Sequence, residues 1–322
     1  MAAATVSLPE ILIGTLASLV ALVVISQIVE ALRPAPKRPE KLAWAPGIPI
    51  QYADIGGKNV RYIKTGAGQN LVLLHTLRTQ LDLFERVVSN LAKYFTVYAL
   101  DYPGHGYSDI PKAQYDADFF VHSVDGFLDH LDLRDVTLCG VSIGGAISLI
   151  MAGQRNSRVV RVVAINPYDY AKGRGMARSS LLGWMITVTS EIPIAGGTVM
   201  RLRNFVIMKA VLQGGVANPK SIRPALLKEM YAVGNRSGHY RAFISLLRNA
   251  ASWEAATQVY GNINVPMCLI WGDKDWSKPS EREHDRSLIP GAQVVTVANS
   301  GHFLPLDRPQ ELSELIVRFG GG

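Results

Sequence analysis

Alternation of strand-like and helix-like segments is the feature of this sequence that most constrains its fold. Short runs rich in apolar and β-branched residues are typical of strands and lie at 50–55, 59–65, 70–76, 95–101, 135–140, 159–166, 265–272 and 293–298. Apolar residues at helical spacing predict helices at 79–95, at 116–133, from 144 onward and at 309–319. This alternation predicts an α/β fold with a mainly parallel sheet that is covered by helices on both faces.

A long interruption of the alternation lies at residues 168–260. Helix-like apolar segments, separated by Gly and Pro, occur there at 180–189, 205–215, 224–233 and 242–250. They predict a helical insertion over one end of the sheet, which we call the cap (residues 168–260). The sheet-forming core is then expected at 50–167 and 261–322.

The cap carries an uneven distribution of charge. Residues 172–248 contain 12 Lys or Arg and two acidic residues, Glu191 and Glu229, which is a net charge of +10. The whole chain carries +7, so the remainder carries −3. A basic, apolar cap predicts contact with an anionic membrane surface, and a solvated cap that is basic by chance is an equal alternative. Nucleic acid is disfavoured as a partner, because stacking aromatics do not alternate with these charges.

An uncharged segment of 19 residues lies near the N-terminus, at residues 11–29. As a helix it is about 28 Å long, close to the thickness of the hydrocarbon core of a bilayer. It predicts a transmembrane anchor at 11–30 after a short tail at 1–10. A secretory signal peptide is the alternative, but the first ten residues contain no Lys or Arg and no A-x-A cleavage pattern follows.

Charges that flank the predicted anchor indicate its orientation. Glu10 precedes the segment, whereas Arg33, Lys37, Arg38 and Lys41 follow it. The positive-inside rule therefore predicts a single-pass protein whose large domain lies on the cytoplasmic side. The Pro-rich segment 31–49 is predicted to be a short stiff linker.

Both cysteines, Cys139 and Cys268, lie inside apolar strand-like runs. This setting predicts free, buried thiols, not a disulfide or a metal site. Free thiols agree with a reducing compartment.

One serine stands between glycines at the end of a predicted strand and the start of a predicted helix, in Gly140-Val141-Ser142-Ile143-Gly144. A hydroxyl must project beyond its own backbone to attack a carbonyl, and a sharp strand-to-helix turn provides that projection. The flanking glycines relieve crowding in such a turn. The pattern therefore predicts that Ser142 is a nucleophile.

A base and an acid follow at suitable places. His302, in the loop after the last predicted strand, is expected to lie at the same sheet edge as Ser142 and to act as the base. Asp275, in the segment WGDKDWSKP, is the preferred acid for orienting His302. Asp273 and Asp169 are weaker candidates for that role.

Taken together, LLHT, DYPGHGYSD, GVSIGG, GDKDWSKP and SGHFLPLDRP resemble motifs of the α/β-hydrolase superfamily, over about residues 51–319. The resemblance implies an oxyanion hole made of the backbone N–H groups of Ile143 and Leu77. The family usually has His-Gly where this chain has His75-Thr76, and threonine restricts the backbone there.

Three further residues are interpreted through the same resemblance. Arg78 contacts either an acidic substrate group or solvent, and we favour solvent. His105 belongs to a loop motif of the family and is expected to be structural. An aspartate at the elbow is typical of dehalogenases and epoxide hydrolases, so Ser142 argues against both chemistries.

The expected function is that of a membrane-anchored serine hydrolase acting on a lipophilic carboxylic ester, of the lipase or esterase type, without a metal or an organic cofactor. Its layout is similar to that of membrane-anchored monoacylglycerol lipases. Thioesters, amides, lactones and C–C bonds remain alternative targets, because members of the superfamily cleave all of them. A receptor-like member that binds a small ligand with little turnover is the alternative from a different class.

Overall fold

The computed structural model describes residues 7–320, and its core is a sheet of eight strands. The strands are β1 (Ile50–Asp54), β2 (Asn59–Thr65), β3 (Gln69–Leu74), β4 (Phe95–Leu100), β5 (Val136–Val141), β6 (Val159–Ile165), β7 (Met267–Gly272) and β8 (Gln293–Val297). Their order is β1-β2-β4-β3-β5-β6-β7-β8. Strand β2 pairs antiparallel with β1 and with β4, and all other neighbouring strands of this sheet pair in parallel. The predicted mainly parallel sheet is thus confirmed.

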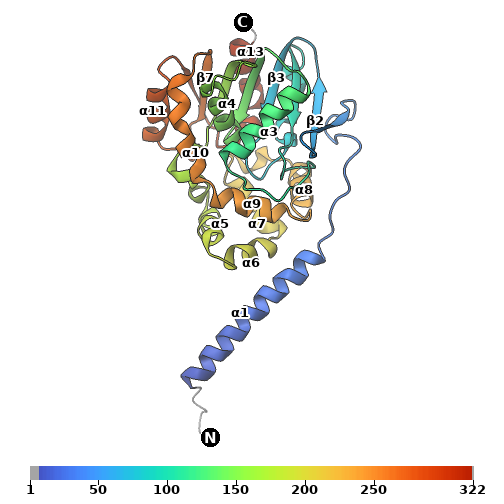
Figure 1. Ribbon diagram of the computed structural model, residues 1–322, viewed down its shortest axis with the longest axis vertical. Helices are drawn as coiled ribbons and strands as arrows, with labels where there is room; N and C mark the ends of the chain where they lie inside the picture. Colours follow the sequence, from blue (N-terminus) through green and yellow to red (C-terminus); the bar gives the residue numbers. More distant parts are fainter. Residues whose placement is uncertain (1–6, 321–322) are drawn as a thin grey trace.

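Helices cover both faces of the sheet. On one face α3 (Ala117–His130) packs against α4 (Ile143–Gly153), and on the other α2 (Val88–Leu91) packs against α13 (Pro309–Gly320) (Figure 1). Every residue of α4 is buried, because this helix packs on β5 and β6 and is flanked by α3 and by the segment Ala256–Asn262. The fold is therefore the predicted α/β fold.

The cap connects β6 to β7 along the chain, and it lies below the sheet in Figure 1. It contains α5 (Leu181–Glu191), α6 (Ala195–Arg201), α7 (Phe205–Gln213), α8 (Pro224–Val233), α9 (His239–Arg248) and α10 (Ala251–Ala255). Four of these helices were predicted from apolar spacing. The short helices α6 and α10 were not, because too few residues are available for a period to be visible.

Much of the positive charge of the cap is engaged inside the fold. Arg178 pairs with Glu281 at 2.7 Å, and Arg223 pairs with Glu85. Arg203 is buried and pairs with Glu30 at 2.6 Å. These contacts pair three of the 12 basic residues of the cap with acidic residues outside it.

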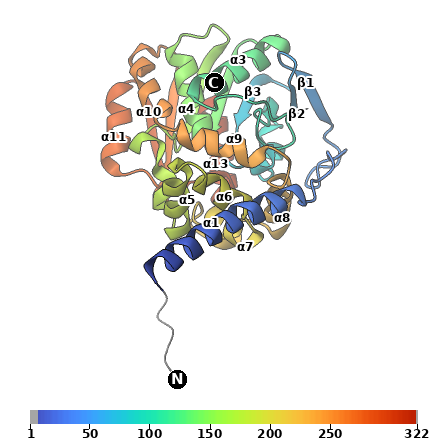
Figure 2. The ribbon, with the colours of Figure 1, turned by 60° about the horizontal axis from the view of Figure 1, so that its bottom comes forward.

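The first helix, α1 (Leu8–Ala31), projects away from the rest of the molecule (Figure 1). Its length and composition suit a membrane span, properties that N-terminal signal sequences share. Only its C-terminal end contacts the cap, where it lies across α6 (Figure 2): Arg201 Nε donates to Ser26 Oγ at 3.0 Å. Of the predicted tail at 1–10, residues 1–6 lie outside the described part, and Leu8 already begins α1.

The segment predicted as a linker, 31–49, packs against the core in its second half. Leu42 is 1% exposed, and Trp44 Nε1 donates to Asp82 Oδ1 at 2.8 Å. Lys41 and Pro49 form an isolated antiparallel bridge. The prediction of a linker without folded structure was wrong for the second half of 31–49, because Leu42 and Trp44 pack on the core.

Two helical predictions also differ from the structure. The helix predicted at 79–95 is reduced to a 3₁₀ turn, Leu81–Phe84, and the short α2. The turn is held by side chains of the core, since Leu81 N donates to Asp101 Oδ1 at 2.7 Å. In contrast, α11 (Pro279–Leu288) was not predicted, because within it only Asp285 is buried and no apolar period exists.

Candidate active site

The candidate nucleophile Ser142 lies on the predicted turn between β5 and α4. Its φ of 60° and ψ of −119° are strained for a non-glycine residue. A Cβ atom on Gly140 would lie 2.0 Å from the carbonyl oxygen of Gly144, and one on Gly144 would lie 2.3 Å from that of Leu74. Both positions therefore require glycine, as the sequence pattern indicated.

The structure brings Ser142, His302 and Asp275 together in one line of hydrogen bonds. His302 Nε2 lies 2.8 Å from Ser142 Oγ, and His302 Nδ1 lies 2.5 Å from Asp275 Oδ1. With Nδ1–H donating to the carboxylate, Nε2 is free to accept the hydroxyl proton. Both Ser142 and His302 are fully buried, so the line is shielded from bulk water.

The carboxylate of Asp275 is held by three hydrogen bonds on its two oxygens. Oδ1 bonds His302, while Oδ2 accepts from Ser277 N at 2.9 Å and from Ser277 Oγ at 2.5 Å. Burial alone would raise the pKa of Asp275, but the charge of His302 and these hydrogen bonds lower it below its ordinary value. Asp275 therefore stays ionised beside the imidazole.

The two other candidate acids do not reach His302. Asp273 Oδ1 accepts from Ser300 N at 3.0 Å. Asp169 Oδ2 accepts from the hydroxyl of Tyr260 at 2.7 Å, and burial raises the pKa of Asp169 to about 6. The geometry therefore selects Asp275 among the three.

The candidate oxyanion donors, Leu77 and Ile143, lie on the turn after β3 and at the first position of α4. Within residues 7–320, neither backbone N–H donates a hydrogen bond to a protein acceptor. An N–H group without an internal partner at a helix start is available to a developing negative charge.

His75 holds the turn that carries Leu77. Burial lowers the pKa of His75 to about 3, so the ring is neutral. Its Nδ1 lies 2.8 Å from the carbonyl oxygen of Thr76, and its Nε2 accepts from Tyr102 N at 3.3 Å. The threonine that departs from the family pattern is thus fixed by the histidine before it.

Two residues that support His302 were missed by sequence reasoning. The ring of Trp276 stacks on His302 with centroids 3.8 Å apart, and its Nε1 donates to Gly214 O in the cap at 3.0 Å. Asn166 Nδ2 donates to the carbonyl oxygens of Gly301 and His302, at 3.1 and 3.0 Å. The only available signal was their position: Asn166 ends one predicted strand, and Trp276 lies in the loop after the next.

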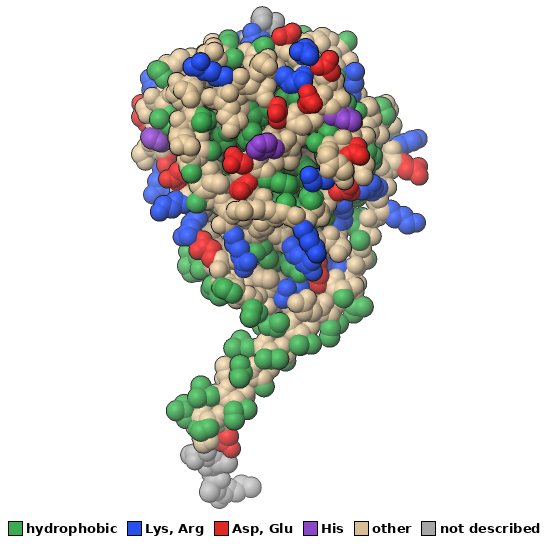
Figure 3. Space-filling model, in the orientation of Figure 1, with side chains coloured by type: hydrophobic (Ala, Val, Ile, Leu, Met, Phe, Trp, Pro, Cys, Tyr) green, Lys and Arg blue, Asp and Glu red, His purple; other side chains and the backbone are tan. Residues whose placement is uncertain are grey.

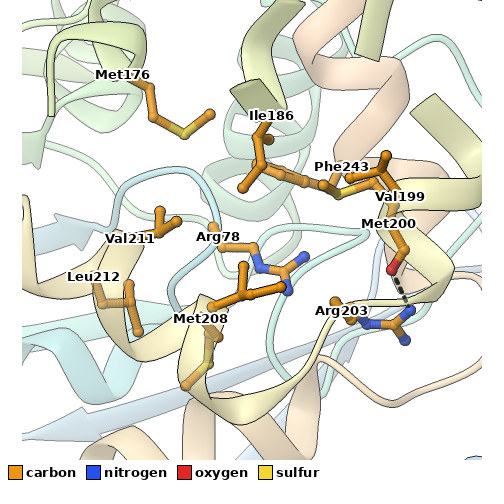
Figure 4. Close-up of a pocket in the computed structure, with 11 residues that line it drawn as sticks. Arg78, Met176, Ile186, Val199, Met200, Arg203, Met208, Val211, Leu212 and Phe243 are labelled. Atoms are coloured by element: carbon orange, nitrogen blue, oxygen red, sulfur yellow. Dashed lines mark hydrogen bonds between the residues drawn. The ribbon is translucent and has the colours of Figure 1, made fainter. Parts of the chain in front are cut away.

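A largely apolar cavity lies under the cap (Figure 4). Its wall is formed mainly by side chains of α5, α6 and α7, such as Ile186, Met200 and Met208. Met176, also in the wall, donates its backbone N–H to Tyr168 Oη at 2.9 Å, and the Tyr168 ring lies edge-on to His302. Tyr168 thus connects the cavity wall to the ring of His302.

The prediction that Arg78 is solvated holds only in part, because the residue is partly exposed. Its side chain lines this cavity, and its Nη1 is buried with no hydrogen-bond partner among residues 7–320. The guanidinium carbon lies 4.9 Å from the ring centroid of Phe243. The positive φ of Arg78, 62°, directs the chain so that this side chain turns inward beneath the cap.

His105 and the two cysteines form no hydrogen bond with the Ser142 hydroxyl, whose partner is His302. His105 is buried among His75, Tyr102 and Phe120, and burial lowers its pKa to about 3. Cys139 and Cys268 are free and buried, and burial raises the pKa of Cys268 to about 11. These positions agree with structural roles.

Comparison with known proteins supports the same fold. An uncharacterized protein of Mycobacterium tuberculosis is 25% identical over 284 residues, covering 84% of this chain and 80% of the relative. Haloalkane dehalogenase 2 of Mycobacterium tuberculosis is 26% identical, covering 84% and 94%. The crystal structure of the enol-lactonase from Burkholderia xenovorans LB400 has a TM-score of 0.67 and 24% identity, covering 84% and 100%.

A match to a family model assigns the chain to a protein family, in agreement with these pairwise similarities. The model for the alpha/beta hydrolase fold matches residues 69–309, which include Ser142, Asp275 and His302. The match covers most of the chain and spans both parts of the sheet with the cap between them. The chain belongs to the alpha/beta hydrolase fold family.

Proposed function

We propose that this protein is a membrane-anchored serine hydrolase that cleaves a lipophilic carboxylic ester. The observation that carries the proposal is the hydrogen-bonded line from Ser142 Oγ to His302, at 2.8 Å, and on to Asp275, at 2.5 Å. A serine at the elbow favours acyl transfer over dehalogenation, for which the resemblance leads us to expect aspartate there. Hydrolase chemistry itself agrees with the dehalogenase and lactonase among the similar proteins.

The proposed reaction proceeds in two stages. Ser142 Oγ attacks the ester carbonyl carbon while His302 Nε2 takes the hydroxyl proton, and the N–H groups of Leu77 and Ile143 stabilise the resulting oxyanion. The intermediate collapses, and the alcohol leaves with the proton from His302. Water, deprotonated by His302, then attacks the acyl-enzyme and releases the carboxylic acid with Ser142 restored.

A lipophilic substrate is supported by the cap. The cavity wall is mostly aliphatic, and around it α5, α6 and α7 expose Leu181, Trp184, Val199 and Val206, by 74%, 52%, 39% and 73%. Val199 belongs to both the cavity wall and this exposed face. Hydrophobic side chains gather on the cap where α1 leaves it (Figure 3). Such a face suits the interfacial region of a bilayer, from which a lipophilic ester would enter.

We propose that α1 spans the membrane and that the large domain lies on the cytoplasmic side. Arg33, Lys37, Arg38 and Lys41 follow the helix and support this orientation. Two of them also act within the fold, since Arg33 donates to Asn235 Oδ1 at 3.2 Å and Arg38 pairs with Asp109 at 2.7 Å. The exposed apolar face of the cap adjoins the C-terminal end of α1, so both would meet the same membrane surface.

The proposed function is tested with the full chain in detergent. We expect a fluorophosphonate probe to label the protein at Ser142, and p-nitrophenyl esters to be hydrolysed with kcat/KM rising from two-carbon to longer acyl chains. Equal rates on short and long chains would contradict the lipophilic substrate. No labelling of folded protein would contradict the hydrolase and favour the ligand-binding alternative.

Contact between the cap and lipid makes a separate prediction through Trp184, which is 52% exposed and one of five tryptophans. In vesicles that contain brominated acyl chains, we expect the tryptophan fluorescence to fall by roughly the contribution of Trp184. An interfacial side chain reaches the boundary of the acyl chains, where bromine quenches it. Trp184→Phe should abolish this quenching. Trp44→Phe, at a partly buried position packed on the core, should retain it. Identical quenching in both variants would contradict the proposed membrane face.

A further inference from the structure

Arg78 is the cation that the proposed reaction leaves unused. It follows Leu77, the candidate oxyanion donor, and its side chain extends into the middle of the apolar cavity (Figure 4). Its Nη1 is buried and unpartnered within residues 7–320, although a buried guanidinium nitrogen without a hydrogen bond carries a large desolvation cost. Contact with the Phe243 ring offsets only part of that cost.

The charges around Arg78 do not balance. Glu30, at the end of α1, is the carboxylate whose charge reaches Arg78, but it already bonds Arg203 at 2.6 Å and Arg33 at 3.3 Å. Three guanidinium groups therefore share one carboxylate. Burial first, and then repulsion by Arg203 and Arg33, lower the pKa of Arg78 to about 9, so the group is still protonated at neutral pH.

The two histidines near Arg78 do not compensate its charge. Burial lowers the pKa of His105 to about 3 and that of His239 well below its ordinary value, so both rings are neutral. Neither Nδ1 has a hydrogen-bond partner within the described chain. Arg78 thus faces an apolar cavity with one positive charge that the surrounding described residues leave unmatched.

We propose that Arg78 binds a carboxylate group of the substrate, so that the ester cleaved at Ser142 is an amphiphile with an apolar chain and one negative charge. The inference rests on the proposed function. A single free guanidinium matches a monoanion, and its planar donors fit a carboxylate in bidentate fashion. A dianionic phosphate would call on a second cation, and Arg203 is already engaged by Glu30. The aliphatic wall of the cavity receives the chain.

The test compares two substrates that differ only in charge: the p-nitrophenyl monoester of adipic acid, and the same compound with its free carboxylate methylated. For the wild-type full chain in detergent, we expect kcat/KM to favour the acid roughly 10- to 100-fold, the value of a charge-assisted hydrogen bond. Arg78→Gln should reduce this ratio to about 1, and Arg78→Lys should give an intermediate ratio. Arg134→Gln is the matched control, since Arg134 is 70% exposed and pairs only with a surface aspartate; it should keep the wild-type ratio.

A binding measurement separates this inference from the proposed function. Octanoate should raise the melting temperature of the wild type and of Arg134→Gln but not of Arg78→Gln, and octanol should not reproduce this difference. If neither ester is hydrolysed but octanoate stabilises in an Arg78-dependent way, the proposed function fails and the carboxylate site stands. An unchanged substrate ratio in Arg78→Gln, or equal stabilisation of both proteins by octanoate, would overturn the site. Should Arg78→Gln fail to fold, Arg78→Lys decides by the same two readouts.

Discussion

Replacing Ser142 with alanine is expected to lower kcat for p-nitrophenyl esters by on the order of 10⁵-fold, because the proposed covalent route loses its nucleophile. The hydroxyl bonds only His302, and the backbone N–H of Ser142 still donates to Ile165 O at 2.8 Å. Alanine meets the same strain at φ 60° as serine does. The variant should therefore fold, and its melting temperature should remain near that of the wild type.

The measurement uses full-length protein in detergent, with initial rates and fluorophosphonate labelling recorded on the same preparation. Ser148→Ala is a matched control, because Ser148 is a buried serine of α4 whose hydroxyl bonds only the carbonyl oxygen of Gly144, at 2.8 Å. It should retain labelling and a rate within a few-fold of the wild type. Retention of more than about 1% of the rate by Ser142→Ala would contradict the proposed role, since loss of the nucleophile leaves far less.

Residues that the sequence places at the ends of buried strands were those whose arrangement could be predicted. Ser142 follows β5 and His302 follows β8, and parallel strands bring their carboxyl ends to one edge of the sheet. Apolar runs identified the strands, and the glycines around Ser142 identified the turn. The relation between Ser142 and His302, 160 positions apart in the chain, thus followed from topology alone.

The features that could not be predicted depend on contacts between distant segments. Arg78 looks like a surface residue in the sequence, and only the cap that folds over it leaves its Nη1 buried without a partner among the described residues. Trp276 looks like part of an ordinary loop, and its stacking on His302 depends on how the loops after β7 and β8 meet. Local pattern carries no information about such pairings, because apolar periodicity reports which face is buried and not what covers it.

Two helices were wrongly predicted or missed because local hydrogen bonds, and not apolar periodicity, determine where they form. The predicted helix at 79–95 is shortened where Arg61 Nη1 bonds Asp82 at 3.1 Å and Asp101 at 3.2 Å, since this buried network fixes the turn at Leu81. The helix α11 lacks an apolar stripe, but Pro279 lies in its first turn and Lys278 N donates to Glu281 Oε2 at 2.7 Å, and both features favour a helix start.

Asp275→Asn is expected to lower kcat by about 10⁴-fold with little change in KM. A neutral amide does not stabilise the imidazolium, and it does not hold His302 in the tautomer that carries the proton on Nδ1. Asp273→Asn is the matched control. Asp273 lies two positions away, accepts from Ser300 N at 3.0 Å and does not contact His302, so its variant should keep kcat within a few-fold of the wild type. Similar losses in both variants would mean that the effect comes from disturbing the loop after β7.

Asp275→Asn also has a pH signature in stability. His302 and the hydrogen bonds from Ser277 hold the pKa of Asp275 below its ordinary value, so the folded state binds its proton less readily than the unfolded chain does. The stabilisation by this carboxylate is therefore fully present above the pKa of an unfolded aspartate, about 3.9, and is lost as the pH falls through the lower folded value. We expect the melting temperature of Asp275→Asn to lie below that of the wild type at pH 7 and the difference to narrow toward pH 3. A constant difference across this range would show that Asp275 acts through packing, and the loss of kcat would then no longer identify its charge as the cause.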